Sequence, residues 1–206
     1  MKIIQFVKQL NNTELGKGGT HDSYVLIPNE LDVSDIFETV NTPISFIDCD
    51  SQEQVNIRHT IGREKRIVGL GEYYRSKNLS AGDEIIFERR ICSSFDEYKI
   101  RVRKNQNRIV FKKERRGFEI LTPERMGLIE TWKPDLHETF EIVLLTSERK
   151  RQDSPSVTDY YDFLVNEESQ LASFVGNTGW LSINNHHIQF VNFYGWKKYE
   201  IGTEEE

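Results

Sequence analysis

Short stretches in which apolar and polar residues alternate dominate the first half of the chain. Alternation of this kind, bounded by turn residues, is typical of half-buried β-strands. It predicts strands over residues 2–10, 24–27, 44–48, 52–60, 84–88 and 98–103. We therefore expect this half to be mainly β.

Two short helices are expected between these strands. The first covers residues 29–39, where Val33, Ile36 and Phe37 share one helical face. The second follows the glycines near residue 70 and runs through about residue 77 before a Ser-Ala-Gly-Asp turn.

The pattern changes after about residue 104. A turn is expected at residues 105–107, and the strand after it, residues 108–112, is predicted to pair with the strand over 98–103. The remaining predictions are a helix over residues 121–131 with Pro123 in its first turn, a buried strand over 140–146, a linker over 147–156, a helix over 157–172 and a β-rich run over 180–199. We therefore predict two domains, residues 1–104 and an α+β extension over residues 105–206.

Residues 69–89 carry a recognisable motif, GLGEYYRSKNLSAGDEIIFER. It resembles the end of the plant B-three DNA-binding domain, in which a short helix leads into an L-x-A-G-D turn and a strand. The same part of the EcoRII-type effector domains of restriction enzymes is similar.

The N-terminal loop supplies a second, independent match. Residues 11–28 read NNTELGKGGTHDSYVLIP, and EcoRII-type effector domains carry a loop of the form N-D-T-G-x-T-G-x-H-Q-x-G-x-x-I-P. The positions that keep this outline are Asn12, Thr13, Gly16, Gly19, His21, Ile27 and Pro28. The chain departs from the outline at Leu15, Asp22 and Tyr24.

The resemblance implies a fold and a function. The fold is mainly β with short helices: a B-three-like open β-barrel (pseudobarrel) over residues 1–104, followed by the α+β extension. The function is site-specific binding of double-stranded DNA within a cytoplasmic restriction-modification system for phage defence. Two loops would grip the major groove, the N-arm at residues 11–23 and the C-arm at residues 60–67.

The same resemblance implies partners and an absence of catalysis. A nuclease or motor domain or subunit of the restriction system would act with this chain, as in McrB-like and LlaJI-type restriction subunits. This chain itself is expected not to be an enzyme, to need no cofactor or metal, and to have no membrane partner.

The two loops differ in the chemistry of their side chains. Hydrogen-bonding groups can read base edges in the major groove, and the N-arm candidates are Asn11, Asn12, Thr13, Lys17, Thr20, His21, Asp22 and Ser23. Basic groups neutralise phosphates, and the candidates in and beside the C-arm are Arg58, His59, Arg63, Lys65 and Arg66. We expect the N-arm mostly to specify and the C-arm mostly to anchor, although Arg63 or Arg66 could also read guanine.

The net charge of −6 is unusual for a DNA-binding protein. The charge is uneven, because residues 89–116 hold 11 basic and 3 acidic side chains whereas residues 117–206 hold 7 and 16. Salt screens exposed charges beyond roughly 8–10 Å. A basic patch on an acidic body can therefore still bind phosphates.

Composition limits the other classes of protein. No apolar run approaches the roughly 20 residues that span a bilayer, and the N-terminus is too polar for a signal peptide. Cys49 and Cys92 are too few for a disulfide framework, so a reduced cytoplasmic setting is expected.

Two alternative functions remain open. Asp135, Glu148 and Lys150 have the spacing of a PD-(D/E)xK nuclease, in which carboxylates hold Mg²⁺ and a lysine orients water. The acidic second half could instead serve as a protein-interaction module of a restriction or regulatory complex. The pair His186-His187 is expected to be structural, because neighbours on a strand point to opposite faces.

Overall fold

The computed structural model describes residues 1–17, 23–104, 108–132, 138–149, 152, 157–173, 180–182, 188–191 and 196–202. The chain forms two compact units, Met1–Lys104 with Gly195–Glu206, and Asn105–Tyr194. The last strand thus belongs to the first unit, whereas the sequence had assigned it to the extension over residues 105–206. The reason is its ladder with the first strand, in which Lys2 pairs with Gly202 and Lys8 with Trp196.

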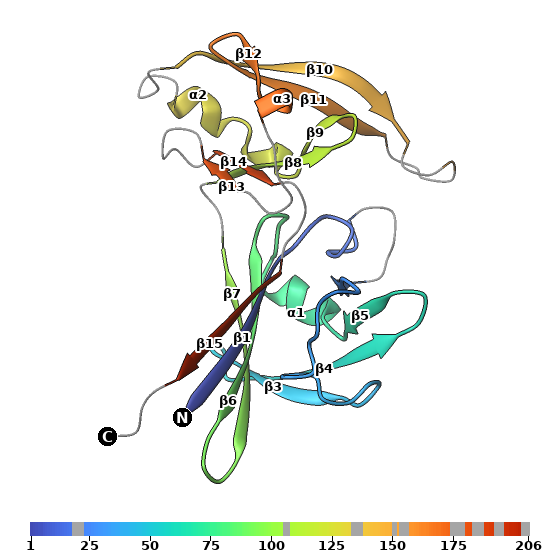
Figure 1. The fold of residues 1–206 in the computed structure, drawn as a ribbon, viewed down its shortest axis with the longest axis vertical. Helices are drawn as coiled ribbons and strands as arrows, with labels where there is room; N and C mark the ends of the chain where they lie inside the picture. Colours follow the sequence, from blue (N-terminus) through green and yellow to red (C-terminus); the bar gives the residue numbers. More distant parts are fainter. Residues whose placement is uncertain are drawn as a thin grey trace. The chain divides into compact units, whose positions relative to one another are not determined.

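The first unit is one curled sheet of eight strands (Figure 1). The strands are β1 Lys2–Gln9, β2 Tyr24–Ile27, β3 Ile44–Asp48, β4 Gln54–Ile61, β5 Lys65–Val68, β6 Glu84–Ile91, β7 Asp96–Arg103 and β15 Trp196–Gly202. Their order is β15-β1-β6-β7-β3-β4-β5-β2, and only β3 and β7 pair in parallel. Among the residues of this unit that the structure describes, one helix is formed, α1 over Gly71–Ser76. The predicted open β-barrel and the helix near residue 70 are confirmed.

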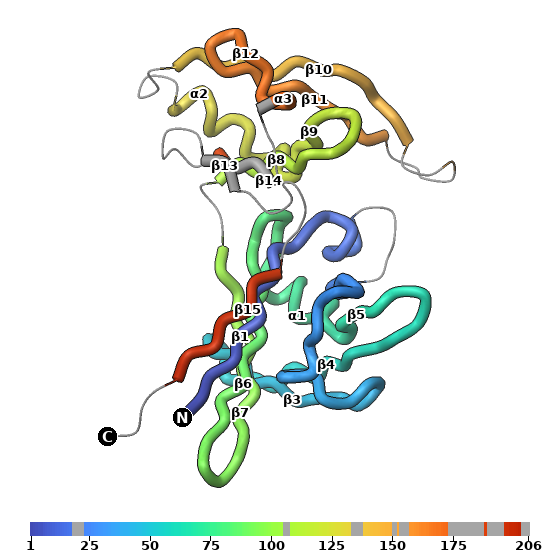
Figure 2. The backbone as a smooth tube through the Cα atoms, viewed as in Figure 1, coloured from blue at the N-terminus to red at the C-terminus, as the bar shows by residue number. Residues whose placement is uncertain are grey.

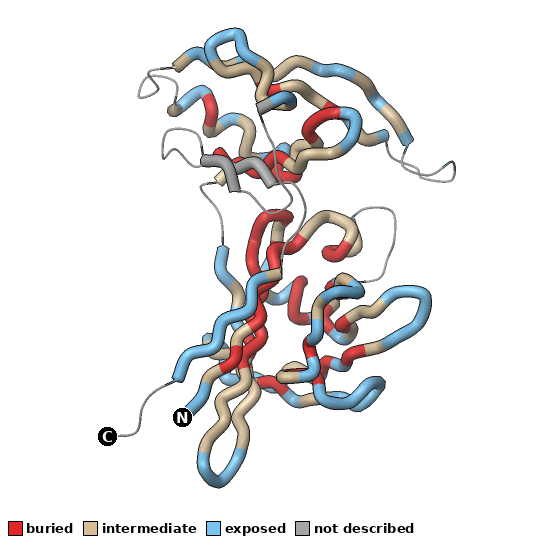
Figure 3. The backbone as a smooth tube through the Cα atoms, in the orientation of Figure 1, coloured by how far each residue is buried: buried red, intermediate tan, exposed pale blue. Residues whose placement is uncertain are grey.

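Aromatic side chains fill the barrel. Phe37 contacts both Phe46 and Phe87, with ring centroids 5.8 Å and 5.6 Å away, and all three rings are buried. Strand β6 has neighbours on both sides and buries its first five residues, as the red segment in Figure 3 shows. Its run of Ile85, Ile86 and Phe87 is therefore continuous rather than alternating.

A tryptophan links the two ends of the strand order. Trp196 on β15 stacks on Phe87 at 6.2 Å and donates a hydrogen bond from Nε1 to the carbonyl oxygen of Leu26 on β2, at 2.9 Å. Strands β15 and β2 share no ladder, so this side chain connects the open edges of the barrel.

A buried ion pair holds the start of the N-arm against the barrel. Glu14 and Lys8 are each 2% exposed in their side chains, and Lys8 Nζ lies 3.1 Å from Glu14 Oε2. The other oxygen, Oε1, accepts a hydrogen bond from the backbone N–H of Leu26 at 3.0 Å. One carboxylate thus joins β1, the N-arm and β2.

A glycine after β5 is required by the backbone. Gly69 has φ +95°, and a Cβ there would lie 2.6 Å from the carbonyl oxygen of Asn56. We predict that Gly69→Ala lowers the free energy of unfolding by about 1–3 kcal/mol, measured by urea denaturation. Gly62→Ala is the control, because its Cβ meets nothing within 4 Å. Equal stability of the two variants would contradict this reading.

The carboxyl group of Asp48 makes stability depend on pH. Its burial raises its pKa, but hydrogen bonds from Lys77, Ser51 and Tyr73 outweigh burial and lower the pKa to about 2. Because the folded pKa lies below the ordinary value of 3.8, the ionised group contributes about 2 kcal/mol above pH 4, which is lost as the pH falls toward 2.

We predict a flatter acid profile for Asp48→Asn. The difference in unfolding free energy between pH 7 and pH 3 should shrink by about 1 kcal/mol, because roughly half of the Asp48 contribution is lost by pH 3. Asp50→Asn, a change of a 65% exposed carboxylate that also pairs with Lys77, is the control. An unchanged profile for Asp48→Asn would show that this carboxylate is not the acid-sensitive group.

The second unit is built on a sheet of seven strands. Its elements are β8 Ile109–Glu114, β9 Gly117–Ile120, η1 Pro123–Arg125, α2 Leu128–Trp132, β10 Phe140–Glu148, β11 Thr158–Val165, β12 Glu168–Ser169, α3 Gln170–Ser173, β13 Trp180–Ser182 and β14 Ile188–Val191. The main order is β10-β11-β9-β8-β14-β13, with β12 paired to β11. The buried core consists of Ile109, Phe111, Phe118, Ile129, Phe163 and Ile188. Figure 2 traces this chain path.

Four predictions of local structure were wrong. Residues 29–39 form short turns instead of a helix, since the Phe37 N–H donates to Val33 O in one turn that does not continue. Val33, Ile36 and Phe37 are nevertheless buried as expected. Residues 157–172 are mainly strand β11, because that segment pairs with both β9 and β10.

The other two errors concern pairing and burial. Strand β8 pairs with β9 and β14 and not with β7, because it belongs to the second sheet. Strand β10 lies at the edge of the sheet as far as the described strands go, and it is only half-buried. The predicted helix over 121–131 is split into η1 and α2, and the turn at 105–107 and most of the linker lie outside the described residues. Within the described part of the chain, no helix has the length and apolar character needed to cross a membrane.

Candidate nucleic-acid interface

Strand β4 changes partners halfway along its length. Its first half, through Ile57, pairs with β3, and its second half, from Arg58, pairs with β5. Strand β5 pairs in turn with β2, so β4, β5 and β2 form a small sheet at one end of the strand order.

Cross-strand register gathers polar side chains on one face of this small sheet. Directly opposed residues share a face, and the first row across the strands is Tyr24, Val68 and Arg58. The second row, two residues along each strand, is Leu26, Arg66 and Thr60.

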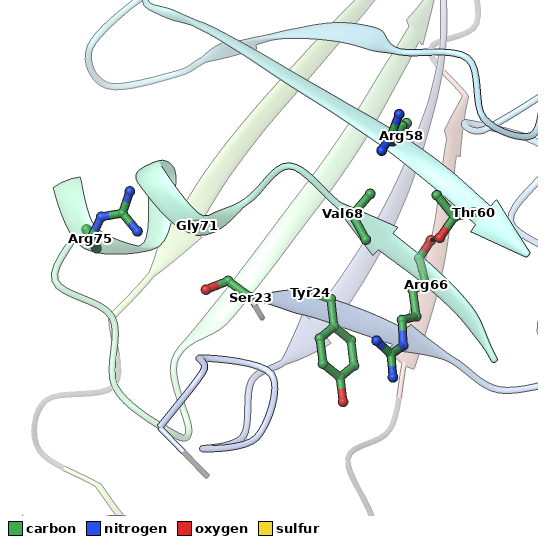
Figure 4. A pocket seen from close by; sticks show the side chains of 8 residues that line it. All are labelled: Ser23, Tyr24, Arg58, Thr60, Arg66, Val68, Gly71 and Arg75. Carbon is green, nitrogen blue, oxygen red and sulfur yellow. Dashed lines mark hydrogen bonds between the residues drawn. The ribbon is translucent and has the colours of Figure 1, made fainter. Parts of the chain in front are cut away.

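This face contains a polar hollow of about 470 Å³. Figure 4 shows its lining residues, which are Ser23, Tyr24, Arg58, Thr60, Arg66, Val68, Gly71 and Arg75. Ser23 is the last residue of the N-arm, Thr60 and Arg66 belong to the C-arm, and Arg75 comes from α1. Three arginines from three elements thus face one hollow, which we call the arginine hollow.

The guanidinium of Arg66 is held in place. Its Cζ lies 4.1 Å from the centre of the Tyr24 ring, and its Nε and Nη2 donate to Glu64 Oε2 at 3.0 Å and 2.7 Å. Arg58 and Arg75 are exposed and form no ion pair within the described residues. Their charges are therefore available to an anionic ligand.

Two predicted DNA contacts lie on the opposite face of the small sheet. His59 is 7% exposed, and its Nε2 has no hydrogen-bond partner among the described residues. Burial, and to a lesser extent the Lys65 ammonium, lower the pKa of His59. Lys65 donates from Nζ to the carbonyl oxygen of Asn29 at 3.2 Å. Both residues line a separate hollow of about 320 Å³.

Arg63 lies at the turn between β4 and β5 and is exposed. The C-arm is thus a hairpin with Arg66 and Thr60 on the face of the arginine hollow, Arg63 at its turn and Lys65 on the other face.

The described part of the N-arm is an ordered turn. The backbone N–H of Glu14 donates to Asn11 Oδ1 at 2.8 Å, and Lys17 N–H donates to Asn12 O at 2.8 Å. Lys17 Nζ donates to the carbonyl oxygen of Leu79 at 3.0 Å. Asn11 is thus engaged in holding the loop, and Thr13 is half-buried. Thr20, His21 and Asp22 lie outside the described residues.

The basic segment over residues 89–116 carries less unpaired charge than its composition indicates. It is divided between the two sheets, and many of its cations are paired with carboxylates. The pairs are Arg89 with Glu38 and Asp96, Arg90 with Glu88, Lys99 with Glu97, Arg103 with Glu84, Lys104 with Asp83, Lys112 with Glu114, and Arg116 with Glu148. The net charge of +8 counted along this segment is therefore largely neutralised locally.

Sequence reasoning missed Arg75 and Tyr24 as parts of the site. Arg75 follows the buried Tyr73 and Tyr74 on α1, so its helical position already indicated an exposed side chain. Tyr24 departs from the family outline and here supports Arg66.

The nuclease constellation and the histidine pair fall largely outside the described residues. Asp135, Lys150, His186 and His187 are not described, and Glu148 is paired with Arg116. Among the residues that are described, no group of three His, Cys, Asp or Glu side chains could hold a metal ion.

Comparison with known proteins gives likenesses of structure only. No model of a protein family and no curated protein matches the chain. The Arabidopsis FUS3–DNA complex is 17% identical with a TM-score of 0.35, over 48% of this chain and 94% of that chain. The N-terminal domain of Helicobacter pylori LlaJI.R1 is 13% identical with a TM-score of 0.35, over 50% of this chain and 80% of that chain. At these values the likenesses assign no function to this chain.

Proposed function

We propose that this chain binds double-stranded DNA at specific sites through the face of β4, β5 and β2 that contains the arginine hollow. The observation that carries the proposal is the meeting of Arg58, Arg66 and Arg75 in one hollow that Ser23 of the N-arm and Thr60 of the C-arm also line. Guanidinium groups suit phosphate and guanine equally, because both accept paired hydrogen bonds.

The polarity of the hollow supports an anionic, hydrogen-bonding ligand. Of its eight lining residues, Tyr24 and Val68 are the apolar ones, and the Arg66 guanidinium covers the Tyr24 ring. A pocket for an apolar small molecule would instead be lined mostly by apolar side chains.

The two loops divide the work in this proposal. Arg58 and Arg75 anchor phosphates, while Asn12, Lys17, Thr20, His21 and Asp22 of the N-arm contribute most of the base readout. Arg63 sits at the C-arm turn and is also proposed to contact DNA.

Single N-arm substitutions test this division. We predict that Lys17→Ala, His21→Ala or Asp22→Ala reduces the difference in affinity between the cognate duplex and a random duplex. The reason is that a good base contact discriminates by about 1–3 kcal/mol. Fluorescence anisotropy with both duplexes measures the gap. A change that lowers both affinities equally would make the N-arm a phosphate clamp.

The sequence resemblance further supports a place in a restriction system. In this proposal, cleavage or translocation belongs to a nuclease or motor domain or subunit, and this chain recognises the site. Incubation of the selected duplex with this chain and Mg²⁺ should leave it intact. Cleavage that disappears in both Asp135→Ala and Glu148→Ala would establish the nuclease alternative instead.

Selection from a random duplex library tests the proposal as a whole. Libraries with and without cytosine methylation should each be exposed to the full chain and the bound fraction sequenced. We expect one enriched motif in at least one library. Bound fractions with no enriched motif would leave only non-specific electrostatic binding, and no retention at physiological salt would contradict DNA binding.

A further inference from the structure

Strand β2 lies at the end of the strand order and pairs only with β5 among the described strands. Other parts of the chain satisfy its remaining backbone groups. Glu14 accepts twice, from the Tyr24 N–H at its carbonyl oxygen (3.1 Å) and from the Leu26 N–H at Oε1 (3.0 Å). The carbonyl oxygen of Tyr24 accepts from the Tyr74 hydroxyl at 3.3 Å. The carbonyl oxygen of Leu26 accepts from the Trp196 indole N–H at 2.9 Å. This edge of β2 is therefore held by single hydrogen bonds and not by a ladder.

The barrel core fixes the position of the Trp196 indole. The ring stacks on Phe87 with centroids 6.2 Å apart and meets Phe6 edge-on at 6.1 Å, and both phenylalanines are fully buried. The ladder between β15 and β1 sets the backbone of Trp196 opposite Lys8. The side chain is only half-buried, so burial alone does not force its N–H to find this acceptor. The bond to Leu26 is thus a link between two strands that share no ladder.

The residue that Trp196 holds belongs to the proposed DNA-binding face. Leu26 lies directly opposite Arg66 in the ladder of β2 and β5. Two residues earlier, the Tyr24 ring supports the Arg66 guanidinium at 4.1 Å (Figure 4). Ser23, the last residue of the N-arm, directly precedes Tyr24 and lines the arginine hollow. A shift of β2 would therefore move the support of Arg66 and the end of the N-arm together, whereas binding groups must be held within about 0.5 Å of their productive positions.

We propose that Trp196 is a positioning residue for DNA recognition, which fixes the edge strand β2 and with it Tyr24, Arg66 and the end of the N-arm. This role rests on the proposed function of the arginine hollow and extends that function to β15, the strand that follows the second unit in the chain. Trp196 is not among the residues that line the hollow. It acts through the carbonyl oxygen of Leu26 and not through contact with DNA.

Trp196→Phe separates the hydrogen bond from the packing, because phenylalanine keeps an aromatic ring beside Phe87 but has no N–H. We expect the variant to bind the selected duplex about threefold to tenfold more weakly, as for the loss of one hydrogen bond, and to prefer it less over a random duplex. Fluorescence anisotropy with the full chain measures both, and urea denaturation checks that the variant is folded. Without DNA, amide hydrogen exchange in β2 should be faster than in the unmodified chain.

Tyr199→Phe is the matched control, because it alters a 46% exposed ring on the same strand. It should leave the affinity, the preference and the exchange of β2 unchanged. A second measurement needs no variant to fold: the indole N–H resonance of Trp196 in the unmodified chain should shift when the selected duplex is added, because coupling between binding and this bond is reciprocal.

The outcomes distinguish this role from the proposed function. If the unmodified chain binds the duplex and a folded Trp196→Phe variant has the same affinity, preference and β2 exchange, Trp196 is not a positioning residue, although the proposed function stands. An equal loss of affinity in Tyr199→Phe would assign the effect to the strand as a whole and overturn the role of the indole N–H. Absence of duplex binding by the unmodified chain would overturn both.

Discussion

Replacing Arg58, Arg66 and Arg75 together by alanine will lower the affinity for duplex DNA by at least about 100-fold, because each removes a charge-assisted hydrogen bond to phosphate or base. The three side chains line one hollow, so the loss should exceed that from three scattered surface arginines. The slope of log affinity against log salt should also become shallower, by about 0.9 for each lost phosphate contact.

The control for this prediction is Arg101→Ala. Arg101 is an exposed arginine on β7 in the same unit, outside the arginine hollow. The Arg101→Ala variant should bind duplex DNA with an affinity within about threefold of that of the unmodified chain, because the position of an arginine, and not its charge alone, determines binding. Binding that is unchanged in a folded triple variant would rule out the hollow as the DNA-binding face.

Glu14→Ala will lower the free energy of unfolding of the first unit by about 3–5 kcal/mol, because it leaves the ammonium group of Lys8 buried without this carboxylate. It also removes the acceptor of the Leu26 N–H on β2. For a chain of this size the expected decrease in Tm is roughly 10 °C.

Two variants separate the causes of this loss. Glu14→Gln keeps an oxygen that can accept from the Leu26 N–H but removes the negative charge. Its free energy of unfolding should therefore lie between those of the alanine variant and the unmodified chain. Glu30→Ala alters an exposed glutamate and should change stability by less than about 0.5 kcal/mol. A Glu14→Ala variant as stable as Glu30→Ala would show that the buried pair does not hold the N-arm to the barrel.

Most strands of the first unit were predictable because alternation and turn residues agree with tertiary pairing. Strand β5 was missed, because its residues were assigned to the C-arm loop. Strands β2 and β3 have the predicted ends. The prediction failed where an apolar pattern fits two structures. Val33, Ile36 and Phe37 are buried as a helical face would be, but one turn suffices to bury them. Residues 157–172 carry aromatic and branched side chains that pair as a strand once β9 and β10 lie beside them.

The site was predictable at the level of loops and only partly at the level of side chains. Alternation along β4 already implied that Arg58 and His59 face opposite ways, and the structure places only Arg58 at the arginine hollow. The contributions of Arg75 and of the Lys8–Glu14 pair needed the fold, because the spacing of these residues in the sequence shows neither that Arg75 lines the hollow nor that the ion pair is buried. Arg75 lies on α1, after the small sheet's last strand, and reaches the hollow only through the path of the chain.

The most direct test of the central claim is amide hydrogen exchange of the full chain with and without the selected duplex. The account predicts slower exchange in residues 11–23, in the hairpin of β4 and β5, and at the start of α1, with Arg101→Ala giving the same pattern. Protection confined to β6 and β7 or to residues 108–191, with none in the hairpin, would contradict it.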